Sequence, residues 1–328
     1  EETYTIWNKR PDLAPEVRED LDKIANDNEA LEDAFYTPME FGTAGMRGLI
    51  GAGINRMNIY TVRQATEGLA RFMDTLDEET KLRGVAISYD SRHMSQEFAF
   101  EAARVLGAHG IPSFVFESLR PTPELSFTVR HLHAYAGIMI TASHNPKQYN
   151  GYKIYGEDGA QMPPKESDMI TNYIREVDDL FAVEVADKDA LINDNTLQVI
   201  GSEVDEVYLE NAKEVTIDRE LVAEEGKTMK LVFTPLHGTG GMLGEKALRQ
   251  AGFEDFTMVP EQAMPDPEFP TVEHPNPEFT EAFDLAIKLG KSQKADLLVA
   301  VDPDADRLGA AVRQPDGEYE LLTGNQIA

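Results

Sequence analysis

The sequence predicts an α/β fold made of repeated β-α-β-α-β domains with mostly parallel sheets. Three short apolar segments in the first part of the chain alternate with segments of helical periodicity, and the same alternation returns in the second part. Such alternation indicates parallel strands joined by right-handed crossovers. Because 328 residues exceed what a single hydrophobic core usually organises, we expect more than one domain.

The first predicted unit follows an acidic, helix-prone stretch at 15–34. Its elements alternate, with strands at 83–90, 113–116 and 136–140 and helices at 60–76, 98–109 and 122–132. From 177 to 206 the composition turns acidic and the periodicity is lost, which is typical of a solvated linker. We therefore expect the first domain to span 1–203.

The second predicted unit repeats the pattern, which indicates an internal structural repeat. Its strands are expected at 229–235, 256–260 and 295–301, and its helices at 241–251 and 278–289. We expect this domain to span 204–322, with 323–328 starting a truncated third domain. Since the chain begins with Glu1 and stops where a helix starts, we expect a piece of a longer protein.

Composition excludes several classes of function. The formal net charge of -29 argues against general nucleic-acid binding, which needs a basic face, so an anionic substrate requires local arginines and lysines. The chain has no cysteine, which excludes disulfides and thiol catalysis. No run of about 18 apolar residues and no signal pattern is present, so we expect a soluble, cytoplasmic protein with no membrane partner. The sequence gives no indication of the oligomeric state.

The segment T-A-S-H-N-P, residues 141–146, directly follows the predicted buried strand at 136–140. A turn at that point places the Ser143 hydroxyl at the carboxyl edge of the sheet, where open α/β folds bind ligands. Serine, asparagine and proline also form turns for local reasons. His144 and Lys153 favour a site, because both can carry protons or offset negative charge, and Gly151 would let the backbone approach a ligand closely.

The segment F-G-T-A-G-M-R-G, residues 41–48, is a glycine-rich loop. Its glycine spacing is not the dinucleotide fingerprint and no strand precedes it, so we exclude a nicotinamide site. The planar guanidinium of Arg47 could meet a phosphate through two hydrogen bonds, although a solvated arginine in a turn is the alternative. Asp90 and Arg92, at the end of the strand at 83–90, are expected near Ser143 in a supporting role or as an ion pair only.

The segment V-D-P-D-A-D-R, residues 301–307, follows the last apolar strand. Alternate residues of an extended segment share one face, so we expect the carboxylates of Asp302, Asp304 and Asp306 to converge. Converging anions need a cation, and oxygen ligands without sulfur or imidazole favour Mg²⁺.

Two alternatives for this aspartate loop fit less well. A calcium-binding EF-hand would need glycine and glutamate where the chain has Arg307 and Arg313. A phosphatase of the haloacid-dehalogenase kind would use Asp302 as its nucleophile, but this leaves Asp306 and the Ser143 loop unexplained.

Several motifs resemble those of the α-D-phosphohexomutases, the phosphoglucomutase and phosphomannomutase superfamily. T-A-S-H-N-P-x-x-Y-N-G-Y-K resembles their active-site loop and is most like the bacterial phosphoglucomutase branch. The segments F-G-T-A-G-M-R-G, D-S-R, P-L-H-G-T-G-G and D-P-D-A-D-R are similar to further family motifs in the expected order. P-L-H-G-T-G-G is interpreted as structural. Pro303 replaces the usual glycine of the metal loop, a change that we expect an extended segment to tolerate.

The resemblance implies reversible interconversion of glucose 1-phosphate and glucose 6-phosphate, with glucose 1,6-bisphosphate as intermediate and activator. It implies a phosphoryl group on Ser143 and one Mg²⁺ held by that group together with Asp302, Asp304 and Asp306. From the residues themselves we expect catalysis by Lys153, which would transfer a proton with the sugar hydroxyl, and by its polar neighbour His144. The resemblance implies a catalytic role for Arg47, and phosphate or substrate binding is expected of Arg307, Arg47, Asp90 and Arg92.

Other readings of the same resemblance stay open. The sugar phosphate could be that of mannose or a pentose, since the family's sugar-recognition and C-terminal phosphate-binding domains would lie beyond this chain. The piece is therefore expected to be inactive by itself, and a non-catalytic metal-binding fragment is the alternative to an enzyme.

Overall fold

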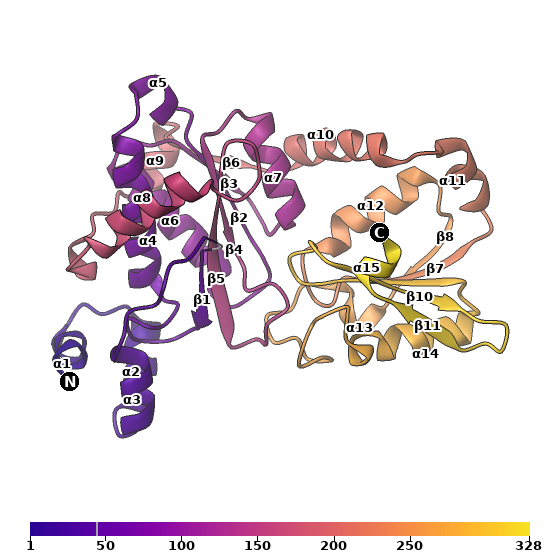
Figure 1. Cartoon of the computed structure of the whole chain (residues 1–328), viewed down its shortest axis with the longest axis horizontal. Coiled ribbons are helices and arrows are strands. Elements are labelled where there is room, and N and C mark those ends of the chain that lie inside the picture. The colour runs from indigo at the N-terminus through magenta and orange to yellow at the C-terminus, as the bar shows by residue number, and fades with distance from the viewer. Residues whose placement is uncertain (44) are drawn as a thin grey trace.

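The computed structural model describes residues 1–43 and 45–328. Two α/β units lie side by side, the first drawn in indigo to pink and the second in orange to yellow (Figure 1). Each unit has its own sheet, of six strands in the first and five in the second. The expected α/β class with repeated units is confirmed.

The first sheet has the strand order β1-β5-β4-β2-β3-β6, and its neighbouring strands β4, β2, β3 and β6 are parallel. At the other edge, β5 and β1 are antiparallel to their neighbours. The strands are β1 (Met46–Leu49), β2 (Val85–Tyr89), β3 (Ser113–Phe116), β4 (Ala136–Ile140), β5 (Tyr149–Tyr155) and β6 (Leu197–Ile200).

Helices cover both faces of this sheet. Val85 and Ile87 of β2 pack with residues of α4 and α6, whereas Ala86 between them packs with Leu125 of α7 on the opposite face. Strand residues that alternate between two apolar faces read as one continuous hydrophobic run, as expected for a parallel sheet buried on both sides. The helices are α4 (Ile59–Asp74), α5 (Glu78–Lys81), α6 (Ser95–Ala108), α7 (Thr122–His131), α8 (Pro164–Arg175) and α9 (Lys188–Asn193).

The N-terminal stretch predicted as helical at 15–34 is two helices rather than one. After α1 (Glu2–Lys9), the chain forms α2 (Pro15–Ile24) and α3 (Asn28–Phe35). The break occurs at Asp27, whose side chain accepts a hydrogen bond of 3.1 Å from the backbone N–H of Ala30 and so caps α3.

The prediction of a linker at 177–206 is wrong for part of that range. Residues 197–200 form β6, which pairs in parallel with β3. Only Leu197 and Ile200 of this strand are buried, so its hydrophobic pattern is too short to be distinguished from a loop. A short 3₁₀ turn at Leu180–Ala182 and helix α9 also lie in this stretch.

The second sheet has the order β11-β10-β9-β7-β8, with β9, β7 and β8 parallel and β10 and β11 antiparallel. Its strands are β7 (Lys230–Thr234), β8 (Asp255–Met258), β9 (Leu297–Val301), β10 (Leu308–Arg313) and β11 (Tyr319–Leu322). The helices are α10 (Ser202–Ala212), α11 (Arg219–Glu225), α12 (Gly240–Ala251), α13 (Pro260–Ala263), α14 (Asp284–Gln293) and α15 (Gly324–Ile327).

Helix α10 joins the two units on one side (Figure 1) and packs against both α7 and α12. The expected domain boundary at 203 falls near its start and stays a prediction. Within the described ranges, no helix is both long and apolar enough to cross a membrane.

Candidate active site

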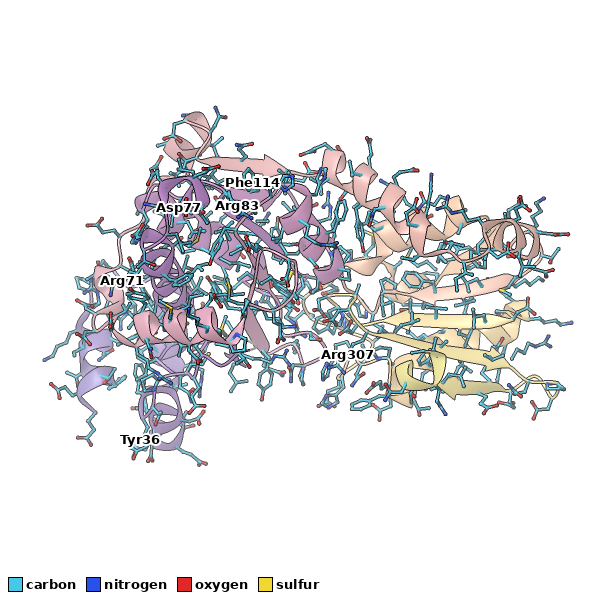
Figure 2. The ribbon with its side chains drawn as sticks, turned by 45° about the horizontal axis from the view of Figure 1, so that its top comes forward. Tyr36, Arg71, Asp77, Arg83, Phe114 and Arg307 are labelled. Carbon is cyan, nitrogen blue, oxygen red and sulfur yellow. The ribbon has the colours of Figure 1, made fainter. Side chains whose placement is uncertain are left out.

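The Ser143 loop and the aspartate loop meet where the two units face each other. The first follows β4 and the second follows β9, so each loop leaves the carboxyl end of a central strand of its own sheet. Ser143 Oγ donates a hydrogen bond of 2.8 Å to Asp302 Oδ2, which lies 159 positions further along the chain. Figure 2 shows Arg307, at the end of the aspartate loop, at the junction between the units. The structure thus brings together two loops that are far apart in the sequence.

Ser143 is held in an unusual backbone conformation. Its φ is 53°, in the left-handed region that non-glycine residues seldom adopt. The backbone N–H of Ser143 donates to Thr141 Oγ1 at 2.8 Å, and the side chain is buried. Such conformations concentrate at functional sites, where surrounding contacts hold them in place. The contacts here fix the hydroxyl toward the second unit.

Arg92 is the centre around which the Ser143 loop is wrapped. Its guanidinium donates to the carbonyl oxygens of Ser143 at 2.6 Å, Asn145 at 2.8 Å, Pro146 at 2.9 Å and Tyr149 at 3.1 Å. These four bonds go to oxygens of one loop, so a single side chain determines the path of that loop.

Asp90 neutralises Arg92 inside the protein. Asp90 Oδ2 accepts from Arg92 Nε at 3.1 Å, and both side chains have no exposed surface. Burial raises the pKa of Asp90 and lowers that of Arg92, and the pair opposes both shifts. Thr141 Oγ1 also donates to Asp90 Oδ2, at 2.7 Å. With no exposed surface, neither residue can reach a sugar phosphate as the chain stands, so the geometry favours the ion-pair alternative over direct substrate binding.

The carboxylates of the aspartate loop converge because of a turn and not because of the extended backbone that we expected. Residues 302–305 form a turn closed by a bond of 2.9 Å from the N–H of Ala305 to the carbonyl oxygen of Asp302, and the φ of Ala305 is 57°. The prediction that these residues form an extended segment is therefore wrong. Pro303 is accommodated because proline suits the second position of such a turn.

Asp302, Asp304 and Asp306 offer oxygen atoms that all lie within 4.8 Å of one another. Asp302 and Asp304 are completely buried, whereas Asp306 is exposed. Burial, followed by repulsion from the other two carboxylates, raises the pKa of Asp302 to about 9. Burial and the charge of Asp304 also raise the pKa of Asp306. The cluster therefore has an unmet demand for positive charge.

The donor atoms fit a hard divalent cation. Among the residues that the structure describes, Asp304 Oδ1 is buried without a hydrogen-bond partner. Asp302 Oδ1 accepts the backbone N–H groups of Asp306 and Arg307, each at 3.1 Å, which leaves its other oxygen to Ser143. A set of carboxylate oxygens with no imidazole or sulfur suits Mg²⁺.

Two cross-unit contacts orient Asp304. Thr122, the first residue of α7, donates through Oγ1 to Asp304 Oδ2 at 2.7 Å and through its backbone N–H to the Asp304 carbonyl oxygen at 2.9 Å. Lys153 Nζ lies 3.9 Å from the same Oδ2. Sequence reasoning missed Thr122, because nothing in the sequence indicates that α7 begins beside the second unit.

Three further predicted residues lie near the Ser143 loop. His144 Nδ1 lies 3.4 Å from Ser143 Oγ, and burial, then the charges of Arg307 and Arg47, lower the pKa of His144. Arg47, on β1, donates to Asn145 Oδ1 at 2.8 Å and has an exposed side chain. Arg307 is also exposed. Both arginines are therefore open to an incoming anion.

Two glycines have a structural reason for being glycine. A Cβ at Gly151 would lie 2.4 Å from the carbonyl oxygen of Thr141, so this glycine allows two segments of the protein backbone to approach each other. The expectation that it lets the backbone approach a ligand is therefore corrected. A Cβ at Gly238 would lie 2.3 Å from Pro303 Cα. Thr239 donates through both its N–H and Oγ1 to the Pro303 carbonyl oxygen, at 2.7 and 2.8 Å. The P-L-H-G-T-G-G segment thus supports the aspartate loop.

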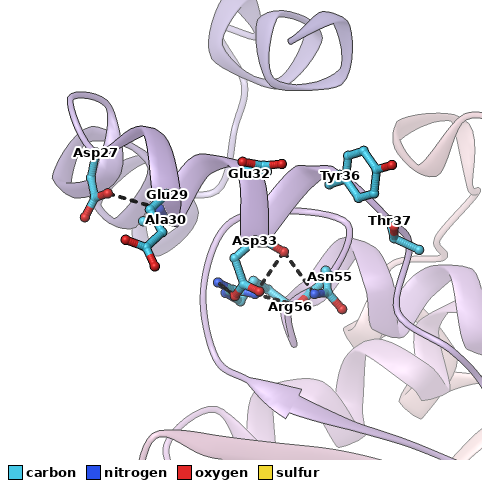
Figure 3. A pocket seen from close by; sticks show the side chains of 9 residues that line it. All are labelled: Asp27, Glu29, Ala30, Glu32, Asp33, Tyr36, Thr37, Asn55 and Arg56. Atoms are coloured by element: carbon cyan, nitrogen blue, oxygen red, sulfur yellow. Dashed lines mark hydrogen bonds and ion pairs between the residues drawn. The ribbon is translucent and has the colours of Figure 1, made fainter.

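A surface hollow beside α3 is unsuited to a sugar phosphate (Figure 3). Four carboxylates line it, and the cation among its described lining residues, Arg56, is engaged with Asp33. An anion placed there would be repelled. The lining residues are Asp27, Glu29, Ala30, Glu32, Asp33, Tyr36, Thr37, Asn55 and Arg56.

Comparison with known families gives two matches. Residues 38–180 match the family described as phosphoglucomutase/phosphomannomutase, alpha/beta/alpha domain I, and residues 206–317 match domain II of the same description. A phosphoglucomutase of Staphylococcus aureus strain N315 is 40% identical over 295 residues, which are 90% of this chain and 52% of the relative. The chain therefore spans about half the length of the curated relatives that it matches.

Solved structures show the same architecture. A crystal structure from Thermus thermophilus, assigned as a phosphomannomutase, has a TM-score of 0.67 at 27% identity and covers 86% of this chain and 58% of its own. Parafusin, a phosphoglucomutase from Paramecium, has a TM-score of 0.64 at 20% identity and covers 87% of this chain and 55% of its own. The second likeness concerns the fold alone.

Proposed function

The chain belongs to the α-D-phosphohexomutase superfamily, and from that membership we propose that its parent protein is a phosphoglucomutase which interconverts glucose 1-phosphate and glucose 6-phosphate. The observation that carries the proposal is the 2.8 Å bond from Ser143 Oγ to Asp302 across the junction. Glucose is favoured because the 40% identical relative is a phosphoglucomutase. A cytoplasmic location belongs to the same proposal.

The proposed reaction moves a phosphoryl group between Ser143 and the sugar. In one direction the bond from Ser143 Oγ to phosphorus breaks, and a bond from a sugar hydroxyl oxygen to the same phosphorus forms. The sugar hydroxyl passes its proton to the unprotonated amine of Lys153, which is the proposed acceptor because it lies 3.9 Å from Asp304 Oδ2, and the released Ser143 oxygen takes up a proton to restore its hydroxyl. The product is glucose 1,6-bisphosphate, which reorients and returns its other phosphoryl group to Ser143.

The backbone around Ser143 supports this role by preorganisation. Because the loop is tied to Arg92, the backbone at Ser143 cannot move away from the second unit without breaking several hydrogen bonds. A fixed nucleophile lowers the entropic cost of reaching an in-line geometry. The lowered pKa of His144 keeps its imidazole neutral near pH 7, so it can exchange a hydrogen bond with Oγ without adding charge.

The three aspartates are proposed as ligands of Mg²⁺, which when bound would draw charge from a phosphoryl oxygen and stabilise the serine oxygen that leaves. A phosphorylated Ser143 Oγ has no proton to donate, so Asp302 Oδ2 would lose its partner and become available. This second oxygen of Asp302 is therefore released by Ser143 only in the phosphorylated state, whereas Asp304 Oδ1 has no hydrogen-bond partner in the unphosphorylated chain.

We propose that positive side chains near the site attract the phosphate although the chain as a whole is acidic. Arg47 and Arg307 are exposed near His144, and Lys153 lies beside Asp304. Planar guanidinium groups can bind phosphate oxygens through two parallel bonds. A phosphate that approaches the junction thus meets two exposed guanidinium cations despite a formal net charge of -29.

Replacement of Ser143 tests the proposal. Ser143→Ala in the full-length protein should abolish mutase turnover and the incorporation of phosphate from labelled glucose 1,6-bisphosphate. Ser167→Ala, at another buried serine, is the matched control and should keep both. Near wild-type turnover in Ser143→Ala would contradict the role of this serine.

A further inference from the structure

Residues Asp266–Val272 of the second unit lie between α13 and the 3₁₀ helix at Thr280–Phe283, and we name them the clamp segment. Phe269, in the middle of the segment, places its ring against Arg92 of the first unit, with 5.1 Å between the guanidinium carbon and the ring centroid. The ring is only 3% exposed. A cation over an aromatic face is attracted most strongly when water is excluded from both, as it is here.

Hydrogen bonding leaves the two faces of the Arg92 guanidinium free to contact an aromatic ring. The N–H groups of a guanidinium lie in its plane, and here they are engaged with Asp90 and four loop carbonyl oxygens. The faces of the plane cannot form such bonds but can stack on a ring. Phe269 therefore adds a contact from the second unit to the group that organises the Ser143 loop.

The backbone of Phe269 is in a conformation that a bulky residue does not adopt by preference. Its φ is 41°, in the left-handed region. The surroundings hold it there through bonds from its N–H to the Asp266 carbonyl oxygen at 3.2 Å and from the Val272 N–H to its own carbonyl oxygen at 3.1 Å. Strain that is maintained by neighbouring contacts points to a positional requirement.

The clamp segment is attached firmly to its own unit. Thr271 Oγ1 is bonded to His237 Nε2 at 2.7 Å, and Asp266 donates through its N–H to the His237 carbonyl oxygen at 3.0 Å. Ser91, next to Arg92 in the chain, donates to that same carbonyl oxygen at 2.8 Å. The second unit therefore holds the segment that carries Phe269 in place through His237.

The exposed side of the segment also contacts the first unit. Glu268 accepts from Lys147 Nζ at 2.7 Å and lies 2.6 Å from His93 Nε2. Lys147 is part of the Ser143 loop, and His93 follows Arg92 directly. The clamp segment therefore touches the loop itself and His93, whereas Ser91, on the other side of Arg92, is bonded to His237, which supports the segment.

We propose that the clamp segment fixes the Ser143 loop, and that Phe269 is a positioning residue which acts through Arg92. The proposal rests on the proposed function only in taking Ser143 as the carrier of the phosphoryl group. Its physical content is that the second unit determines how rigid a loop of the first unit is, apart from any metal or substrate.

Hydrogen exchange in the full-length protein tests the clamp. The N–H groups of Ser143, Asn145 and Tyr149 are bonded within the loop and report its opening. Phe269→Leu should speed their exchange by about ten- to thirtyfold, the range expected for loss of a desolvated cation–π contact. Phe269→Tyr, which keeps an aromatic face, should restore slow exchange.

Phe283→Leu is the matched control, because Phe283 is buried in the same hydrophobic cluster of the second unit. It should leave loop exchange near wild type although it also loses a buried ring. Unchanged loop exchange in Phe269→Leu, or equal acceleration in Phe283→Leu, would overturn the proposal.

A variant on the exposed side covers the case in which Phe269→Leu does not fold. Glu268→Gln should speed exchange of the same groups by roughly two- to fivefold at low salt, as expected for loss of exposed ion pairs. Glu273→Gln, at an exposed acid just beyond the segment, should have no effect. Equal exchange in the two variants would count against the clamp. Since exchange is measured without phosphate, metal or sugar, its result is independent of the Ser143→Ala test.

Discussion

Arg92→Met should destabilise the first unit more than any change at an exposed arginine. The substitution leaves Asp90 buried without its counter-ion, and breaking a buried ion pair from one side costs about 3–5 kcal/mol. Four loop carbonyl oxygens also lose their donor, and each that stays buried adds about 1–3 kcal/mol, although opening of the loop to water would relieve part of this. The lower bound of about 3 kcal/mol is a large share of the roughly 5–15 kcal/mol that stabilises a typical domain.

Urea unfolding of the purified protein measures this loss as a shift of the midpoint at constant slope. Arg219→Met is the control, because the ion pair of Arg219 with Glu214 and its hydrogen bond to the Lys213 carbonyl oxygen are both exposed, so the change should alter stability by less than about 1 kcal/mol. The double variant Asp90→Asn/Arg92→Met removes the isolated charge and should recover at least about 1 kcal/mol relative to Arg92→Met. A cost for Arg92→Met no larger than that for Arg219→Met would refute the view that this arginine organises the loop.

Two further predictions concern the site, and a third concerns a histidine elsewhere in the first unit. Lys153→Met should lower full-length mutase turnover by roughly 10² to 10⁴ with Mg²⁺ affinity nearly intact, and an equal loss of affinity would make the lysine a structural charge. Asp304→Asn should weaken Mg²⁺ binding in calorimetric titration, whereas Asp316→Asn in an exposed turn should not; equal affinities would contradict the metal site. His109 lies between Glu67 and Asp74, and its bond to Glu67 is the main cause that raises its pKa above 6.5. The stability difference between wild type and His109→Gln should therefore be complete below about pH 6.5 and shrink as the pH rises through the folded pKa; a pH-independent difference would contradict this.

The central strands could be predicted from sequence because their burial leaves a direct hydrophobic pattern. Residues 113–116 and 136–140 coincide with β3 and β4, and every position of β4 is buried. Edge strands such as β6 and β11 carry short patterns that become recognisable only beside a partner strand. Hydrophobic runs therefore identify the parallel centre of each sheet and the edge strand β8, and leave the other margins undetected.

The residues of the candidate site could be predicted from the sequence, but the way in which the two units bring them together could not. The sequence placed Ser143 and the three aspartates at the carboxyl ends of strands, but it has no signal for the relative position of the two units. The turn at Asp302–Ala305 was missed because D-P-D-A is equally compatible with an extended segment. Thr122 reaches the site from the start of a helix whose periodicity describes only its own core contacts, and Phe269 reaches Arg92 from a loop that has no periodicity.

The contact between Thr122 and Asp304 has a consequence for any attempt to recombine this protein with its relatives. One oxygen of Asp304 receives its hydrogen bond from the start of α7, so the aspartate loop is completed by a helix of the other unit. A chimera that imported a second unit would need a hydroxyl at position 122 and the same approach of α7. The two units are thus exchangeable only as a matched pair, although each has a hydrophobic core of its own.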